Sequence, residues 1–208
     1  MLRVGLTGGL ASGKSFVGRV LEDLGCLLIR NDDIGHDVLQ PGGEAYSGVL
    51  REFGTGILGE EGSIDRRKLA AIVFHDPAKL QKLNAVVHPP VRARTRQLLD
   101  EYERTHPDGV AIVEAAIMIE TGSYRDYGKL IVAVCSREQE IERAMARDGS
   151  TREEVLERLD RQMPLEDKVK YADFVIDTSG SKDDTRAQVN DVYRSLKNES
   201  LGARTSGV

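Results

Sequence analysis

One glycine-rich segment near the start of the chain constrains the fold more than any other feature. Residues 8–15 read Gly-Gly-Leu-Ala-Ser-Gly-Lys-Ser, which fits the pattern G-x-x-x-x-G-K-[ST] at every fixed position. A strand-like run, residues 3–7, precedes the segment, and an amphipathic stretch, residues 14–24, follows it. The order is therefore strand, loop and helix, which is the structural context of a phosphate-binding loop, or P-loop.

The residue types of this loop predict how a nucleotide binds. Its glycines let successive backbone N–H groups point at phosphate oxygens, and the following helix adds its positive N-terminal end. Lys14 is expected to bridge the β- and γ-phosphates, and the Ser15 hydroxyl to ligate Mg²⁺. A glycine-rich turn without a ligand needs neither residue. The backbone contacts with the nucleotide are expected from Gly9, Leu10, Ala11, Ser12 and Gly13.

Four further apolar runs predict the rest of a sheet, and they span residues 26–29, 110–113, 130–134 and 174–176. Helical patterns separate the runs, so the five strands should lie parallel with crossover helices on both faces. The chain has 208 residues, 40% of them hydrophobic, which is enough for one core. We expect a doubly wound α/β fold over residues 1–208, with a closing helix over 183–197 and a frayed end over 200–208.

Two long intervals between the strands carry only helical patterns. The first contains residues 68–75, 78–87 and 91–104, and it is large enough to bind a second substrate. The second, residues 137–170, is rich in arginine and glutamate and is broken at 148–150. Charge pattern alone fits two solvated helices there as well as a functional segment.

Charged side chains in three places are candidates for phosphoryl transfer. Arg143 and Arg147 lie four residues apart, on one helical face, where they could clamp the transferring group as a lid does, whereas Arg158 is expected at the surface. Asp32 and Asp33 follow the second strand, where a carboxylate can accept the proton of an attacking hydroxyl or cap the next helix.

The third strand ends in Glu114, which either holds a magnesium-bound water or is a charge at the strand end. A P-loop alone leaves hydrolysis, phosphoryl transfer and nucleotide sensing open.

Composition narrows the function further. A formal net charge of −5 argues against general nucleic-acid binding, which requires a basic face. No apolar run approaches the roughly 18 residues that span a bilayer, and the start of the chain lacks the pattern of a secretory signal. Cys26 and Cys135 lie in apolar runs, so we expect reduced core thiols in a cytoplasmic protein.

With these features placed, the chain resembles dephospho-coenzyme A kinase from residue 4 to about residue 196. Residues 6–15 resemble the family segment LTGGIGSGKS, and residues 83–89, Leu-Asn-Ala-Val-Val-His-Pro, resemble LNxIxHP. The order and spacing of the motifs together are specific. The lid and closing-strand motifs of the family are matched by Arg147-Asp148, Arg158, Gln162, Ala172-Asp173 and Ile176-Asp177.

The resemblance implies ATP-dependent phosphorylation of the ribose 3′-hydroxyl of dephospho-coenzyme A, the last step of coenzyme A biosynthesis. It implies Mg²⁺ as cofactor, ATP and dephospho-coenzyme A as partners, a helical coenzyme-binding insertion at about residues 54–93 and a lid at about 137–168. It favours Asp32 over Asp33 as the base and assigns catalysis to Arg147. We also expect nucleotide contacts from Phe16 and Arg143. The resemblance favours substrate contacts for His88 and Glu120.

The sequence departs from the family pattern at several positions. The run Pro-Leu-Leu-Phe-Glu appears as residues 116–120, Ala-Ile-Met-Ile-Glu, and Phe16 replaces a threonine, which leaves Ser15 as the one P-loop hydroxyl for the metal. An asparagine near the last strand is replaced by Thr178. Without the resemblance, His88 before Pro89-Pro90 is a packed residue at the start of a helix.

Two other functions fit the same motifs. A nucleoside or nucleoside-monophosphate kinase would share the P-loop, the aspartates after the second strand and the lid arginines, and would differ in its acceptor. A nucleotide-sensing module would bind ATP without transferring phosphate. The chain is expected to be a monomer or a weak homo-oligomer.

Overall fold

The computed structural model describes residues 1–73 and 76–202 and separates into two compact units. One unit comprises Met1–Ile29 with Glu101–Val208, and the other comprises Arg30–Asp100. His75, the last residue of the helix predicted over 68–75, lies outside the described residues, as do residues 203–208 of the predicted frayed end.

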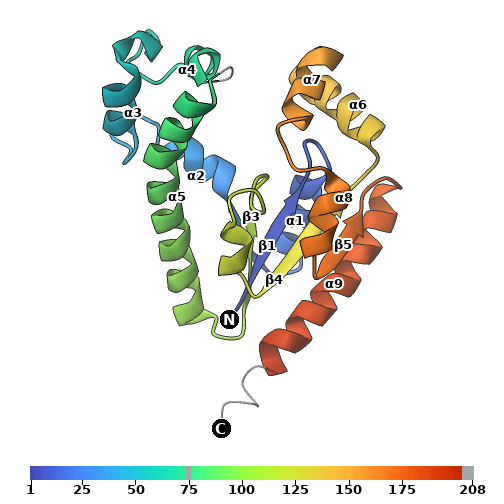
Figure 1. Cartoon of the computed structure of the whole chain (residues 1–208). Helices are drawn as coiled ribbons and strands as arrows, with labels where there is room; N and C mark the ends of the chain where they lie inside the picture. Colours follow the sequence, from blue (N-terminus) through green and yellow to red (C-terminus); the bar gives the residue numbers. More distant parts are fainter. Residues whose placement is uncertain (74–75, 203–208) are drawn as a thin grey trace. The chain divides into compact units, whose positions relative to one another are not determined.

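A five-stranded parallel sheet forms the centre of the first unit, in the order β2-β3-β1-β4-β5. Each strand lies where an apolar run predicts it, so the doubly wound α/β prediction is confirmed. All five strands run toward one edge, at which the P-loop follows β1 (Figure 1). The strands are β1 (Leu2–Gly8), β2 (Leu27–Arg30), β3 (Val110–Glu114), β4 (Lys129–Val134) and β5 (Phe174–Asp177).

The main core lies between the sheet and the helices α1 (Lys14–Asp23) and α9 (Lys182–Gly202). Because the central strands are covered, their residues are apolar on both faces rather than alternating. The predicted fraying from residue 200 is wrong up to Gly202, since Ser200 is buried and its Oγ lies 3.1 Å from the carbonyl oxygens of Asp108 and Gly109. Two short 3-10 turns, η2 (Ser123–Asp126) and η3 (Val169–Tyr171), complete the connections.

Three helices, α6 (Arg137–Asp148), α7 (Arg152–Leu159) and α8 (Leu165–Lys168), occupy the polar interval between β4 and β5. The break predicted at residues 148–150 is confirmed: Gly149 ends α6 in the left-handed conformation with φ +65°. Capping boxes start α6 at Ser136 and α7 at Thr151. Both helices lie beyond the carboxyl ends of β1 and β4 (Figure 1).

The second unit is helical, as predicted. It contains α2 (Asn31–Asp37), α3 (Tyr46–Phe53), η1 (Thr55–Ile57), α4 (Arg66–Val73) and most of α5 (Pro77–Thr105). The two helices expected over 78–87 and 91–104 are one helix, which continues through Pro89 and Pro90. Proline has a backbone φ suited to a helix, but each proline inside a helix removes one hydrogen bond and crowds the carbonyl group one turn earlier.

Thr95 connects two helices of this unit. Its buried Oγ1 lies 2.8 Å from Asn31 Oδ1 at the start of α2 and 2.8 Å from the Val91 carbonyl oxygen in α5. The hydrogen bond between Thr95 and Asn31 fixes the first turn of α2, in which the two candidate aspartates lie.

Across the described ranges, every helix is too short or too polar to cross a bilayer.

Candidate phosphate-binding site

The P-loop backbone lies against the sheet at two glycines where a side chain has no room. A Cβ on Gly8 would lie 2.4 Å from the Ala133 carbonyl oxygen on β4. A Cβ on Gly13 would lie 2.8 Å from Thr178 Oγ1, and Gly13 also has φ +87°. The pattern therefore requires glycine at both ends of the loop because the backbone approaches its neighbours closely.

Lys14 and Ser15 lie in the first turn of α1, at the end of the loop. The Lys14 ammonium donates to the Gly9 carbonyl oxygen at 2.6 Å. The Ser15 hydroxyl donates to Glu114 Oε1 at 2.7 Å, and Glu114 is buried at the end of β3. Hydroxyl and carboxylate oxygens are ligands that Mg²⁺ prefers, so these two side chains fit a magnesium ion.

Thr178 joins the P-loop to α6, a role that its place in the sequence does not indicate. Its buried hydroxyl lies 2.9 Å from the Ser12 carbonyl oxygen. From α6, the Arg143 guanidinium donates to Thr178 Oγ1 at 3.1 Å and to the Thr178 carbonyl oxygen at 2.8 Å. The structure thus brings Arg143 and the P-loop to one threonine.

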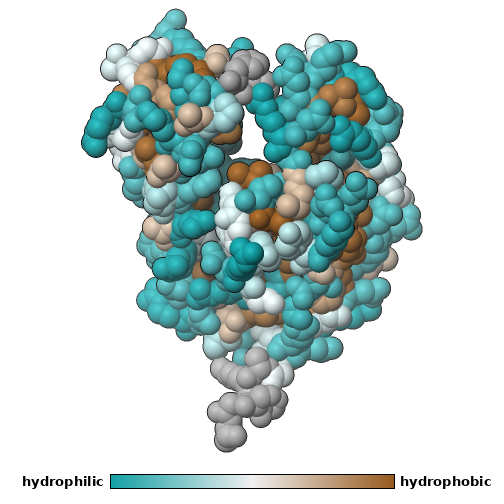
Figure 2. Space-filling view, in the orientation of Figure 1, coloured by the Kyte–Doolittle hydropathy of each residue, from teal (hydrophilic) through white to brown (hydrophobic). Residues whose placement is uncertain are grey.

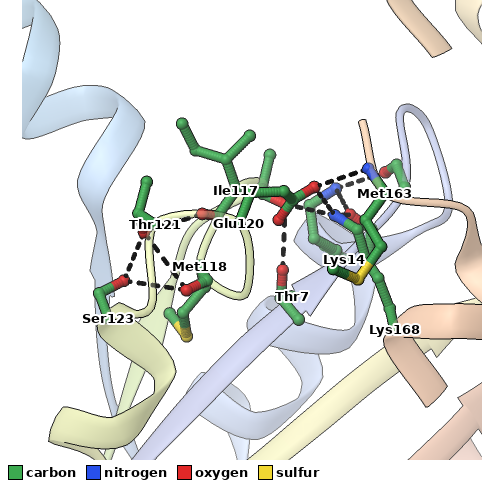
Figure 3. Close-up of polar contacts among 12 residues, drawn as sticks. Thr7, Lys14, Ile117, Met118, Glu120, Thr121, Ser123, Met163 and Lys168 are labelled. Carbon is green, nitrogen blue, oxygen red and sulfur yellow. Dashed lines mark hydrogen bonds and ion pairs between the residues drawn. The ribbon is translucent and has the colours of Figure 1, made fainter. Parts of the chain in front are cut away.

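Lys168 is the second site residue that sequence reasoning missed, because a lysine in the polar run of α8 resembles any solvated lysine. Its side chain is 0% exposed. The ammonium lies 2.8 Å from the Ala116 carbonyl oxygen, 3.3 Å from that of Gly8 and 2.9 Å from Glu120 Oε1 (Figure 3). Glu120 also accepts the Met163 backbone N–H at 3.0 Å. Lys168 therefore connects the end of β1, the segment after β3 and the chain returning from α7.

Leu10 and Ala11 serve the loop through packing. Leu10 is 8% exposed and belongs to a second hydrophobic cluster, to which Ala11 also packs. Complete burial of a leucine contributes about 1.5–3 kcal/mol, so this contact holds the loop firmly to the helices. The other buried members of the cluster come from α6 and α7, and they are Ile141, Ala144, Val155 and Leu159.

Arg147 has different partners from Arg143, although both lie on α6. Its exposed guanidinium makes a two-pronged contact with Asp148, at 2.7 and 3.0 Å. Arg158 of α7 also donates to Asp148, at 2.7 Å. The two arginines hold the pKa of the Asp148 carboxyl well below its usual range. The surface over α6 and α7 is largely hydrophilic around a smaller hydrophobic area (Figure 2).

Phe16 is half-buried and packs against the main core, with the Arg186 guanidinium 5.3 Å from the ring centroid. Its backbone N–H lies 3.0 Å from the Gly13 carbonyl oxygen. The ring thus has a structural task, and the nucleotide contact of Phe16 stays a prediction.

The remaining candidates lie in the helical unit. Asp32 and Asp33 are exposed in the first turn of α2. The capping interpretation is wrong: Arg30 is the N-cap, and in the described structure no side chain caps this helix. His88 is half-buried inside α5, so its placement at a helix start is also wrong. Burial, and next the Arg92 charge, lowers the pKa of the His88 imidazole.

Comparison with known proteins assigns the family. The family model described as dephospho-CoA kinase matches residues 2–184, from β1 into α9. This chain belongs to the dephospho-CoA kinase family. The dephospho-CoA kinase of Aquifex aeolicus is 43% identical over 196 residues, covering 94% of this chain and 98% of that protein. The corresponding protein of Carboxydothermus hydrogenoformans is 42% identical over 194 residues, covering 93% of this chain and 94% of its own.

A solved structure agrees with this assignment. The dephospho-CoA kinase from Campylobacter jejuni has a TM-score of 0.70 to this chain at 29% identity, covering 95% of this chain and 98% of that one. The predicted activity is confirmed at the level of the family, that of an ATP-dependent phosphotransferase. The nucleoside kinase and the nucleotide-sensing module are thereby set aside.

The buried ammonium of Lys168 generates a stability prediction. Lys168→Met keeps the length of the side chain but leaves Glu120 and two carbonyl oxygens without their cation, so we expect unfolding to become easier by about 2–4 kcal/mol. Urea denaturation measures this change. The matched control is Lys170→Met, which removes an exposed lysine paired with Asp167 and should change stability by less than about 1 kcal/mol. Equal losses of stability for Lys168→Met and Lys170→Met would contradict the structural role assigned to Lys168.

Proposed function

We propose that this chain transfers the γ-phosphoryl group of ATP to the ribose 3′-hydroxyl of dephospho-coenzyme A, giving coenzyme A and ADP. The observation that carries the proposal is the P-loop, with Lys14 and Ser15 in place at the end of β1 in a chain of the dephospho-CoA kinase family. Because the phosphoryl transition state is loose, most of the catalysis should come from positioning and from neutralising charge.

The P-loop is the proposed site of the ATP phosphates. Backbone N–H groups of residues 9–16 would bind phosphate oxygens, with the positive end of α1 behind them. Lys14 would exchange its contact with the Gly9 carbonyl oxygen for the β- and γ-phosphates and neutralise the charge that develops during transfer. Arg143 supports the nucleotide from α6, next to Thr178.

Ser15 and Glu114 are the proposed residues for Mg²⁺. The 2.7 Å contact between their oxygens at the P-loop supports this pairing. Ser15 would ligate the ion directly, and Glu114 would hold it through a bound water. When bound, the ion supplies positive charge to the phosphate oxygens.

Asp32 is the proposed base for the 3′-hydroxyl of the acceptor. Its exposed carboxylate in the first turn of α2 is free to receive or orient the hydroxyl proton. We propose that residues 54–93 form the coenzyme-binding insertion, with His88 as a substrate contact and Glu120 as another from the segment after β3. The depressed pKa of His88 keeps its imidazole uncharged at neutral pH.

We propose that residues 137–168 act as a lid over ATP, with Arg147 as the arginine that reaches the transferring phosphoryl group. This requires Arg147 to leave Asp148, an exchange between two exposed charge-assisted contacts.

The free thiol of Cys26, whose pKa burial raises to about 12, supports the expectation of a reducing, cytoplasmic setting. A monomer or weak homo-oligomer stays a prediction.

Acceptor specificity provides the test of the function. Incubation with ATP and Mg²⁺ should add one phosphoryl group to dephospho-coenzyme A, detected by mass, and not to nucleosides or nucleoside monophosphates. Lys14→Ala should lower turnover by about 10²–10³-fold, because the lysine neutralises developing charge, with little change in melting temperature. Phosphorylation of a nucleoside in preference to dephospho-coenzyme A would overturn the proposal, and normal turnover by Lys14→Ala would overturn the role of the lysine.

The lid proposal predicts a separation of two effects. Arg147→Ala should lower turnover more than it weakens ATP binding measured without acceptor, because the arginine reaches the phosphates chiefly after the lid closes. Arg152→Ala is the control, since Arg152 is an exposed arginine of α7 paired with Glu138. Equal losses in turnover and in ATP affinity for Arg147→Ala would count against the lid role.

The acceptor proposal distinguishes two neighbouring carboxylates. Asp32→Asn should lower turnover by about 10²–10⁴-fold, the range for a general base, while the affinities for both substrates change far less. Asp33→Asn should retain most activity, because adjacent residues of a helix point about 100° apart. If Asp33→Asn is inactive and Asp32→Asn is active, the base is Asp33. The proposed kinase activity would still stand in that case.

A further inference from the structure

A buried carboxyl from the lid lies directly against the P-loop. Glu140 of α6 is 5% exposed. A Cβ on Gly9 would lie only 1.8 Å from Glu140 Oε1, so this oxygen occupies the space that the glycine leaves. Within the described ranges, Oε1 is buried and has no hydrogen-bond partner. A carboxyl in such a position is strongly disfavoured in its ionised form.

The groups around Glu140 do not offset the cost of ionising its carboxyl. It borders a cavity of about 300 Å³ that is also lined by Gly9, Gln162 and Leu165. In the described structure, Gln162 Oε1 is likewise buried and lacks a hydrogen-bond partner, so two residues with an unpaired buried acceptor line the same cavity. The titratable and charged groups facing the carboxyl are Lys14 from α1, Lys168 from α8, Arg137 from α6, and Cys135 and Glu166 on the cavity wall.

The three cations are engaged elsewhere. Lys14 donates to the Gly9 carbonyl oxygen, Lys168 is paired with Glu120, and Arg137 is paired with Asp160. Their charges lower the pKa of Glu140, but the larger effect of burial raises it from 4.5 to about 7. The carboxyl therefore changes its charge close to physiological pH.

We infer that Glu140 is a positioning residue that must carry a proton for the P-loop to hold ATP, so that ATP binding takes up a proton from solvent above neutral pH. The inference rests on the proposed placement of the ATP phosphates against Gly9 and Lys14. Bringing phosphate charge to Gly9 places two anions at close range, with little water between them. Protonation of Glu140 removes one of these charges, and no bond of ATP changes.

The direction of the pH effect follows from the two protonation states. Below about pH 7 the carboxyl is already protonated, and ATP binds without a penalty. As pH rises through 7 the free protein loses this proton, and ATP must then restore it, so the affinity falls. The free energy of unfolding should depend on pH in the same direction. As pH rises from about 4.5 to about 7, the buried carboxyl increasingly destabilises the folded protein. At pH values above 7, Glu140→Gln should therefore have a higher melting temperature than wild type.

Titration calorimetry with ATP and Mg²⁺, without acceptor, tests the inference. Runs at pH 6.5 and 8.5, each in buffers of different ionisation enthalpy, give both the affinity and the number of protons taken up. Between these pH values, wild-type affinity should fall by roughly 25-fold more than that of Glu140→Gln, because about 1.5 pH units of the interval lie above a pKa of about 7 and each such unit lowers the protonated fraction tenfold. At pH 8.5 wild type should take up nearly one proton per ATP bound, and at pH 6.5 only a small part of one, whereas the variant should show neither uptake.

The matched control is Glu142→Gln, which alters an exposed glutamate of the same helix and should follow wild type. Protons that ATP itself releases or binds are common to all the proteins and cancel in the comparison. Equal pH slopes and equal proton uptake for wild type and Glu140→Gln would overturn the inference while leaving the proposed function intact. Failure of wild type to bind ATP would overturn both. If Glu140→Gln does not fold, Glu140→Met offers a second neutral side chain for the same measurement.

Discussion

The rest of the structure depends on the hydrogen bonds that side chains donate to the carbonyl oxygens of the P-loop. The Gly8 carbonyl oxygen lies against Lys168, and that of Ser12 against Thr178. A backbone whose carbonyl oxygens are bound from behind presents its N–H groups on the other side, which is the requirement for binding an anion. The two glycines that approach β4 and Thr178 make this orientation possible, because any side chain there would push the loop away.

The site is also organised so that its cations have partners within the chain. Lys14, Arg143 and Arg147 each contact a carbonyl, hydroxyl or carboxylate oxygen of the protein. A cation held in this way loses fewer rotamers when phosphate arrives, and the site avoids uncompensated positive charge meanwhile. When phosphate binds, each of these cations can exchange a protein oxygen for a phosphate oxygen, and few side chains have to become ordered. Lys168 differs from the other three, since its complete burial gives it a task within the fold.

Much of the fold could be predicted from sequence because buried parallel strands are continuous apolar runs, and a P-loop has fixed residue types. The errors have physical causes. Pro89 and Pro90 suggest a helix boundary, but a proline fits the helical φ, and α5 continues through both. The roles of Lys168 and Thr178 could not be predicted, because they come from burial against carbonyl groups far away in sequence. Leu10 was expected to bind nucleotide through its backbone, and nothing local indicates that its side chain packs with α6 and α7.

That packing of Leu10 joins the P-loop to α6 and α7 through one apolar contact region. Helices of a different shape would lack the space that residue 10 fills, and the loop would lose its apolar anchor. Substitutions of the buried residues of α6 and α7 are therefore coupled to the choice of residue 10, while the exposed, charged face of the same helices is free to vary. The variable third position of the P-loop pattern is, in this protein, the place where α6 and α7 are attached.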